Sequence, residues 1–320
     1  MSLFLFKRLI TLLMTLVGAS LVIFGVLEVL PGNAAQMLMG PDASPEAVEA
    51  LVKQLGLDRP PWLRYWDWIS GLLLGDLGLS YAYSTPVAEL IWQRLAVTVP
   101  LALMAMLLTT VLALSAGMYA AARHNKLGDV GVMGLSQLGI AIPNFWFAIL
   151  LILLFSVGLG WFSAGGFPGW TEDDGGGVLP ALKSLLLPAI SLAVVQAAIL
   201  SRITRSAVLE VLREDFVRTA RAKGLSQRAT LWRHVLRNAL IPVITVMGLQ
   251  FAELLAGTIV VENVFYLPGL GRLIFQSISN RDVIVVRNCV MLLAAMVVLV
   301  NFVVDLLYAV IDPRVKASDI

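Results

Sequence analysis

DFVRTARAKGLSQR, at residues 215–228, is a short cationic stretch in which one glycine interrupts a helical pattern. It belongs to a segment, residues 202–238, that carries nine of the chain's 23 basic residues. Long apolar stretches lie on both sides, so the segment connects two helices that cross a membrane. A charged connection of this kind has little reason to keep a helix–break–helix shape unless a partner on its side of the membrane grips it.

The composition places the chain in lipid. Hydrophobic residues make up 59% of it, charged residues 14%, and the mean hydropathy is +0.87, whereas a soluble domain carries about 25% charge. Cys289 is the only cysteine, which excludes an intrachain disulfide and a cysteine metal cluster. Both histidines, His124 and His234, fall in polar connections, which argues against a histidine-held haem inside the membrane. No G-x-x-x-x-G-K-[ST] pattern occurs, so a nucleoside-triphosphate site of that kind has to lie on another chain.

Six stretches approach the length of about 20 mostly apolar residues that a membrane-spanning helix needs. They are residues 9–30, 97–122, 130–160, 179–200, 239–261 and 289–311. The first is longer than the apolar core of a signal peptide, about 7–15 residues, and we therefore expect a first spanning helix. The third is long enough to be tilted or kinked near Pro143. The predicted fold class is a polytopic all-α membrane protein that forms a single domain over residues 1–320.

The positive charges predict the orientation of the chain. Lys7 and Arg8, Arg123 and Lys126, the basic residues of 202–238, and Arg314 with Lys316 all fall on one side of a six-span arrangement. Positively charged loops stay in the cytoplasm, which predicts that both termini lie inside. The opposite connection, residues 161–178, contains no basic residue.

Residues 31–96 form an outer segment that is too long for a simple connection. Ser44 is predicted to cap a helix that starts at Pro45, and Gly56 to end it. Six of the eight tryptophans fall in outer segments, which is typical of side chains that lie in the headgroup region. They are at positions 62, 66, 68, 92, 161 and 170.

Residues 202–238 are predicted to form two short helices on the cytoplasmic side. Residues 205–217 form an amphipathic helix that extends from the fourth span, with Val208, Leu209, Val211, Leu212 and Phe216 as its apolar members. Gly224 breaks the helical pattern, and Ser226 caps a second helix. A plain basic anchor is one interpretation of this charge. The small residues Ala220, Ala222 and Gly224 favour the other, a helix that docks into a groove of a partner.

The segment resembles a known motif. RTARAKG at residues 218–224, followed by HVLRNALIP at residues 234–242, is similar to the EAA loop of ABC-importer permeases, and more specifically to that of the dipeptide, oligopeptide and nickel importers. The resemblance extends over nearly the whole chain. It includes LPG at 30–32, LGLDRP at 55–60, GDLG at 75–78, PNFW at 143–146, ENVFYLPGLG at 262–271, NRD at 280–282 and DLLYAVIDPR at 305–314.

The resemblance implies the type I importer permease fold, a bacterial inner-membrane location and a coupling role for residues 202–238. The coupling residues that it implies are Arg218, Thr219, Ala220, Arg221, Ala222, Gly224, Leu225 and Arg228. Arg218 and Thr219 depart from the wider pattern, which has Glu and Ala there, and His234 and Arg237 depart from it as well. The implied partners are a second permease, two ATP-binding subunits that hold ATP and Mg²⁺, a periplasmic or lipid-anchored solute-binding protein, and membrane lipids. No cofactor, metal, catalytic residue or nucleic acid is expected on this chain.

Polar residues inside the spans are candidates for the translocation pathway. Glu253 lies in the middle of the fifth span, where a charge costs about 2.5–3.5 kcal/mol on insertion scales. Together with Gln250, Gln196 and Asn144 it either lines the pathway, meeting a cationic group of the solute, or forms hydrogen bonds between helices. Near the outer end of the same span, Glu262 is expected to shape an outer segment with the turn at Pro268.

The sequence therefore predicts a permease subunit of an ATP-driven importer of di- and oligopeptides. Nickel or another small solute is the alternative within this class. Outside it, the alternatives are a secondary transporter that uses Glu253 as an ion-coupling carboxylate, and a structural subunit of a respiratory complex.

Overall fold

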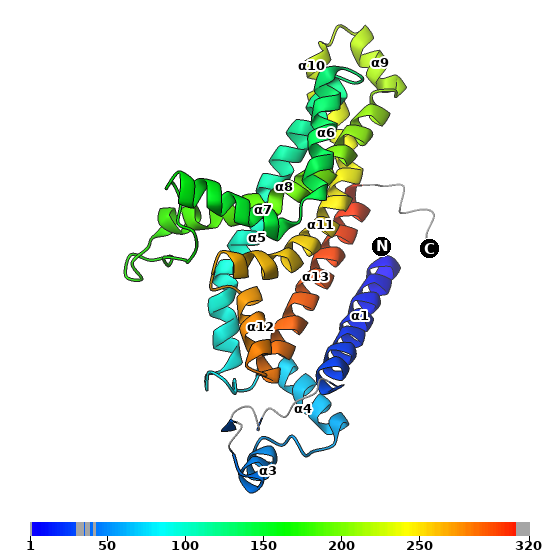
Figure 1. Cartoon of the computed structure of the whole chain (residues 1–320). Helices are drawn as coiled ribbons and strands as arrows, with labels where there is room; N and C mark the ends of the chain where they lie inside the picture. The colour runs from blue at the N-terminus through cyan, green and yellow to red at the C-terminus, as the bar shows by residue number, and fades with distance from the viewer. Residues whose placement is uncertain (1, 30–34, 36–38, 41–42, 312–320) are drawn as a thin grey trace.

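The computed structural model describes residues 2–29, 35, 39–40 and 43–311, and these residues form helices and connections without a β-sheet (Figure 1). The only bridge between extended residues within this part joins Leu79 and Pro86. The helices of the outer segment and the spans are α1 (Ser2–Val29), α3 (Pro45–Gln54), α4 (Pro61–Leu74), α5 (Val87–Ala122), α6 (Leu127–Ala141), α7 (Asn144–Leu151), the π-helix η1 (Ile152–Gly158) and α8 (Val178–Val211). They are followed by α9 (Asp215–Ala222), α10 (Gln227–Thr230), the π-helix η2 (Leu231–Val235), α11 (Leu236–Val264), α12 (Leu270–Ser279) and α13 (Val283–Ile311).

Five continuous helices of the described chain are long and apolar enough to cross a membrane, and a sixth span is possible if α6 and the α7–η1 segment together count as one. The single helix predicted over residues 130–160 is wrong, because the chain bends by 102° between α6 and α7. Ile142 precedes Pro143 and adopts an extended conformation, with φ −90° and ψ 122°. The proline ring disfavours the helical region for its predecessor, so the helix ends there and restarts at Asn144. Figure 1 shows α7 pointing sideways out of the bundle.

Other spans differ from the prediction in their ends. α5 begins at Val87 instead of residue 97, and α13 begins at Val283 instead of residue 289. Pro100, Pro188 and Pro242 lie inside α5, α8 and α11 without ending them. Membrane-spanning helices tolerate prolines where neighbouring helices provide partners for the backbone groups that the proline leaves free.

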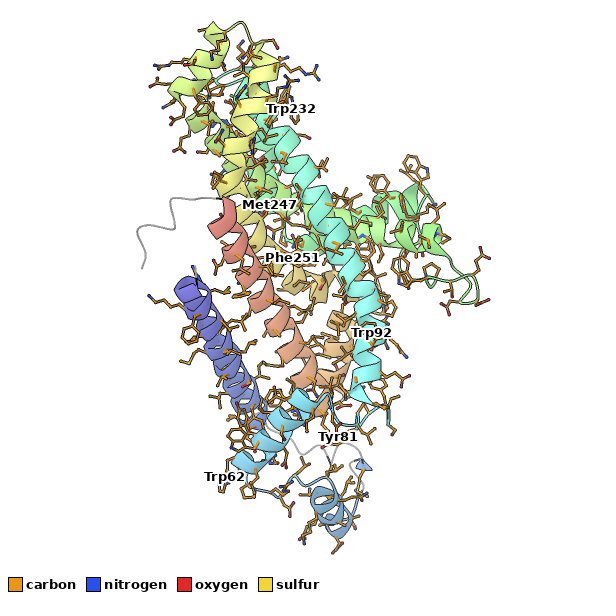
Figure 2. All side chains as sticks on the ribbon, turned by 180° about the vertical axis from the view of Figure 1, so that it is seen from behind. Trp62, Tyr81, Trp92, Trp232, Met247 and Phe251 are labelled. Carbon is orange, nitrogen blue, oxygen red and sulfur yellow. The ribbon has the colours of Figure 1, made fainter. Side chains whose placement is uncertain are left out.

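The two ends of the molecule differ in character. Figure 1 shows α9 and α10 at one end and α3 and α4 at the other, while the N-terminal end of α1 and the C-terminal end of α13 both point towards the α9 end. This arrangement agrees with the predicted orientation, in which both termini share a side with residues 202–238. Trp62 and Trp232 mark the opposite ends in Figure 2. Pro31, Gly32, Arg314 and Lys316 lie outside the described residues.

The caps predicted for the outer helix α3 are confirmed. The hydroxyl of Ser44 accepts a hydrogen bond from the amide of Ala47 at 3.3 Å. Gly56 adopts φ +65°, and the amide of Leu57 donates to the carbonyl of Val52 at 3.0 Å. This is the pattern in which a glycine in the left-handed region closes a helix.

The pair α5–α8 forms the centre of the molecule. Leu101 of α5 and Leu185 and Leu192 of α8 are fully buried together with Leu254 of α11. Close approach of α5 and α8 depends on Gly117, because a Cβ at this position would lie 2.6 Å from Cβ of Thr204. Small residues allow helices in a membrane to approach in this way, and the contact is made by dispersion forces.

We predict that Gly117→Val separates α5 from α8. Such overpacking costs about 1–3 kcal/mol of stability and lowers both the yield and the thermal stability of the chain in detergent. Gly18→Val is the matched control, since a Cβ at Gly18 meets nothing within 4 Å. Equal thermal stability of the two variants would contradict the proposed role of Gly117.

Candidate functional site

The cytoplasmic segment contains a short helix that a glycine turn closes at its C-terminal end. After the extended residue Glu214, α9 runs to Ala222, and Gly224 follows with φ +85°. The amide of Leu225 donates to the carbonyl of Ala220 at 3.3 Å, and that of Gly224 to the carbonyl of Arg221 at 3.0 Å. These two bonds form the Schellman motif, which requires a left-handed residue and therefore favours glycine. The break predicted at Gly224 is confirmed.

The second predicted cap is also confirmed. The hydroxyl of Ser226 accepts a hydrogen bond from the amide of Ala229 at 3.2 Å, and α10 begins at Gln227. The chain then continues through η2 into α11 without leaving a helical conformation. The chain therefore leaves the membrane at the end of α8, turns twice on the cytoplasmic side and returns to the membrane through α11.

The amphipathic helix predicted over residues 205–217 is wrong in its extent. α8 ends at Val211, residues 212–214 form a turn, and α9 restarts at Asp215. The turn changes the direction of the helix. Side chains after it therefore do not lie on the face that a continuous helix would give them. Phe216, predicted as an apolar member of that helix, is 42% exposed, while its neighbour Val217 is 1% exposed.

Val217 and Ala220 attach α9 to the spans. Val217 belongs to a buried apolar cluster with Met118 of α5, Val208 of α8 and Val235 of η2. Ala220 is 7% exposed and faces the chain itself. A force applied to α9 therefore reaches α5, α8 and α11 through packed side chains rather than through a loose loop.

The opposite face of α9 is open to solvent. Among the coupling residues implied by the resemblance, those exposed are Arg218, Thr219, Arg221, Ala222, Gly224 and Arg228, and Leu225 is partly buried. Two large apolar side chains lie on the same segment, Phe216 at 42% and Trp232 at 57% exposure. Exposed aromatic side chains next to arginines are typical of a surface that another protein covers.

An ion pair that sequence reasoning missed lies below this segment. The guanidinium of Arg205, on α8, donates to both carboxylate oxygens of Asp129, on α6, each at 2.6 Å. Asp129 also accepts from the amide of Asn125 at 2.9 Å, and Arg205 lies 3.1 Å from Nδ1 of His124. The side chain of Asp129 is only 4% exposed. The residues are 76 positions apart, and no spacing rule connects them.

The polar residues predicted for the pathway lie close together. The amide of Gln196, on α8, donates to the carboxylate of Glu253, on α11, at 3.1 Å. The amide of Gln250 donates to the carbonyl of Gln196 at 2.9 Å. Asn144, the first residue of α7, lies beside Gly257, so that a Cβ there would be 3.7 Å from its Nδ2. The structure thus brings three of the four residues into one network. Asn144 lies beside Gly257, which is one turn beyond Glu253 along α11.

Two features of this network point towards a ligand. Glu253 is exposed on the surface of this single chain, in the middle of a span. The side-chain oxygens of Gln196 and Gln250 are buried and have no hydrogen-bond partner within the described residues. An exposed carboxylate next to amide groups with unused acceptor capacity attracts a cation or a donor group.

Near the outer end of α11, Glu262 holds the start of α12. Its carboxylate is fully buried and accepts from the hydroxyl of Thr98 at 2.6 Å and the amide of Gly271 at 2.7 Å. A Cβ at Gly269 would lie 2.2 Å from this carboxyl group, and a Cβ at Gly271 would lie 2.2 Å from Cα of Ile259. The prediction that Glu262 shapes an outer segment is confirmed, and both glycines of GLG are needed because the carboxylate and the backbone of α11 occupy this space.

Comparison with known proteins decides the class. The model of the binding-protein-dependent transport system inner membrane component matches residues 113–317, and the model of the N-terminal part of such membrane components matches residues 1–102. The chain belongs to this family. It is an ABC-importer permease of the peptide type and a multi-pass protein of the bacterial inner membrane.

Curated relatives match the permease along nearly its full length. A putative peptide transport system permease of Brucella abortus is 41% identical over 316 residues, with 99% of each chain covered. The dipeptide transport system permease DppB of Alkalihalophilus pseudofirmus is 38% identical, covering 97% of this chain and 98% of its own. The glutathione transport system permease GsiC of Escherichia coli is 40% identical, covering 97% of each.

A solved structure shows the same fold. The inward-facing methionine ABC transporter MetNI superposes with a TM-score of 0.57 over 70% of this permease and 97% of that chain, at 18% sequence identity. The type I importer permease fold is thereby confirmed.

We predict that Arg205→Met weakens the permease more than the paired variant does. Removal of one partner leaves the buried carboxylate of Asp129 uncompensated and costs about 3–5 kcal/mol, whereas removal of both charges is close to neutral. Arg205→Met should therefore lower the thermal stability of the purified chain, and adding Asp129→Leu should restore most of it. If the two changes lowered stability additively, the ion pair would not be the coupled unit inferred here.

Proposed function

We propose that the permease forms half of a translocation pathway for small peptides and that α9 is the surface through which an ATPase drives it. The observation that carries the coupling part is the closed helix α9, which is packed on the spans through Val217 and exposed through Phe216 and Arg221. The curated relatives, named for peptide, dipeptide and glutathione transport, support peptides as the solute class.

The proposed mechanism is mechanical. Two ATP-binding subunits, which hold ATP and Mg²⁺, close on each other and displace α9. Because Val217 packs between α5, α8 and η2, the displacement moves these helices together as a rigid body. The Asp129–Arg205 ion pair extends the moving unit to α6. The permease performs no chemistry in this scheme.

The pathway itself requires a second permease. Glu253 is exposed on the surface of one chain at the level of the membrane interior, where a carboxylate facing lipid is costly. A second permease placed against this face converts it into the wall of a polar pathway. The exposed carboxylate of Glu253, held by the amide of Gln196, then receives the ammonium group of a peptide that an external binding protein delivers.

We predict that Phe216→Ser combined with Arg221→Glu releases the ATPase subunits. The two changes remove an exposed apolar anchor and reverse a charge on the docking face. Co-purification of the ATP-binding subunits with the tagged permease should fall about tenfold, which corresponds to about 1.4 kcal/mol, while the yield of the permease stays constant. Arg237→Glu is the matched control, because Arg237 is an exposed cation of the same segment beyond α10. Full retention of the ATPase subunits by the double variant would exclude docking at α9.

We predict that Glu253→Gln impairs uptake and leaves assembly intact. A hydrogen bond to a charged group contributes about 1.5–3 kcal/mol, so uptake of labelled dipeptide at limiting concentration should fall tenfold or more in cells or proteoliposomes. Glu253→Asp keeps the charge and should retain a substantial part of the activity. Unchanged transport in Glu253→Gln would mean that the carboxylate only joins α11 to α8.

A further inference from the structure

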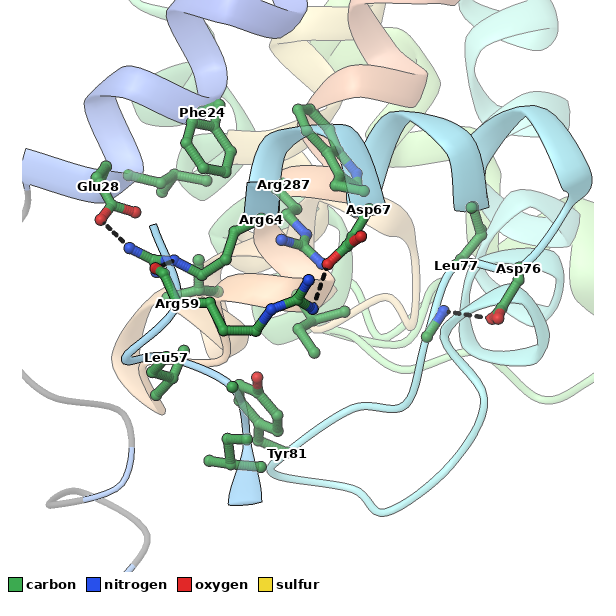
Figure 3. A pocket seen from close by; sticks show the side chains of 18 of the residues that line it. Phe24, Glu28, Leu57, Arg59, Arg64, Asp67, Asp76, Leu77, Tyr81 and Arg287 are labelled. Carbon is green, nitrogen blue, oxygen red and sulfur yellow. Dashed lines mark hydrogen bonds and ion pairs between the residues drawn. The ribbon is translucent and has the colours of Figure 1, made fainter. Parts of the chain in front are cut away.

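The outer end of the permease contains a cavity of about 500 Å³ that is not part of the proposed pathway. It lies between the last turns of α1, the end of α3, α4 and the first turns of α13 (Figure 3). Its volume is many times the roughly 30 Å³ that one water molecule occupies in the liquid. Part of its lining is apolar and includes Phe24, Leu27, Val52, Leu55, Leu57 and Ile284.

The walls of the cavity are fixed by hydrogen bonds between distant segments. Ser20 of α1 and the hydroxyl of Tyr65 of α4 lie 2.8 Å apart. The indole of Trp68 donates to the side chain of Asn288, on α13, at 2.9 Å, and Asn288 donates to the carbonyl of Leu77 at 2.9 Å. The cavity is therefore held open by structure that is already formed, as a binding site requires.

Three arginines and three carboxylates line the cavity, and most of them already form an ion pair or a hydrogen bond within the chain. The guanidinium of Arg59 pairs with Asp67 at 2.5 Å, and that of Arg64 pairs with Glu28 (Figure 3). Asp76 accepts a hydrogen bond from the amide of Gly78 at 2.9 Å and thereby closes the turn after α4.

Arg287 is the remaining arginine of the lining. It makes no ion pair and no hydrogen bond within the described residues, and its Nε is buried without a partner. Its guanidinium lies 5.5 Å from the centre of the Trp68 ring, which orients it but does not neutralise it. The carboxylate of Asp282, whose charge acts on Arg287, already accepts hydrogen bonds from Ser80 and Ala82. Desolvation disfavours the charged form of a largely buried guanidinium, so an anion that binds it directly would stabilise it.

The cavity also offers a neutral donor. Tyr81 lines it, and burial raises the pKa of Tyr81, an effect that the charge of Arg287 partly opposes. Its hydroxyl is therefore protonated at neutral pH. A guanidinium fork and a hydroxyl donor that line the same cavity suit a phosphate, whose oxygens accept paired hydrogen bonds from arginine.

The surroundings indicate where such a phosphate comes from. The apolar window of α1 is only 6% buried by this chain, so an apolar surface lies next to the cavity. On α4, Trp62 is 66% and Trp66 is 63% exposed, as is typical of tryptophans at the level of the headgroups. A guanidinium at this depth can reach the phosphate of a phospholipid headgroup, with which arginine forms paired, charge-assisted hydrogen bonds. We propose that this cavity binds the phosphate of a phospholipid of the outer leaflet through Arg287, with the start of the acyl chains against its apolar wall.

Photolabelling of the assembled transporter tests this proposal. The complex is purified through a tag on the permease and placed in nanodiscs of diglucosyl diacylglycerol, which has no phosphate, doped with a phosphatidylglycerol that carries a photoreactive group next to its phosphate. We expect crosslinks in α4 and in the first turns of α13. Arg287→Gln should lower this labelling about tenfold, while Arg287→Lys should keep most of it. Lys53→Gln, which removes a cation of α3 outside the cavity, should leave it unchanged.

Each competing outcome has a distinct signature. Unlabelled phosphatidylglycerol should compete with the probe, whereas millimolar inorganic phosphate should not. Competition by inorganic phosphate at similar occupancy would assign the cavity to a free anion and overturn the lipid proposal. Equal labelling of Arg287→Gln and the unchanged chain would overturn it as well. Should Arg287→Gln fail to assemble, the crosslinks of the unchanged chain still decide, since labelling away from α4 and α13 contradicts the site.

Discussion

Lipid offers no hydrogen-bond partners, and this constraint explains the polar contacts of the structure better than any other consideration. Each buried polar group inside the spans has to find its partner within the protein. Glu262 meets this requirement through Thr98 and Gly271, and it thereby holds the first turn of α12 against α5. Asp282 does the same at the start of α13, where its carboxylate accepts from the hydroxyl of Ser80 at 2.5 Å. Buried carboxylates thus act as fasteners between segments that lie far apart in the sequence.

The same constraint separates structural charges from functional ones. Asp129 and Arg205 satisfy each other and connect α6 to α8 directly below the coupling segment. Glu253 has one partner, Gln196, and remains exposed on the surface of the single chain. Arg287 lies beside an aromatic ring and makes no hydrogen bond or ion pair within the described residues. The last two are incomplete in the isolated permease, and both mark places where something else, another subunit, a solute or a lipid, completes the structure.

The coupling segment shows how a short helix transmits force. α9 is eight residues long, which is too short to be stable by itself. The turn at Gly224 caps α9, and Val217 packs it against the spans. These contacts stabilise a helix that would not be stable in isolation. A helix held in this way moves with the spans to which it is attached, so that its exposed face can be displaced without being unfolded.

The sequence by itself determined the features that depend on local chemistry: the presence of the apolar spans, the side on which cations accumulate, the helix stops at Gly56 and Gly224 and the caps at Ser44 and Ser226. Hydropathy and capping act over a few residues, and so they can be read without a fold. Only the tertiary structure decided the 102° bend at Pro143, the exposure of Phe216, the burial of Val217, and the pairs Asp129–Arg205 and Thr98–Glu262. Pro100, Pro188 and Pro242 leave α5, α8 and α11 continuous, whereas the chain before Pro143 becomes extended and the helix ends, and the sequence does not distinguish these two outcomes. Side-chain partners separated by 76 or 164 residues are likewise selected by helix packing, which no local pattern specifies.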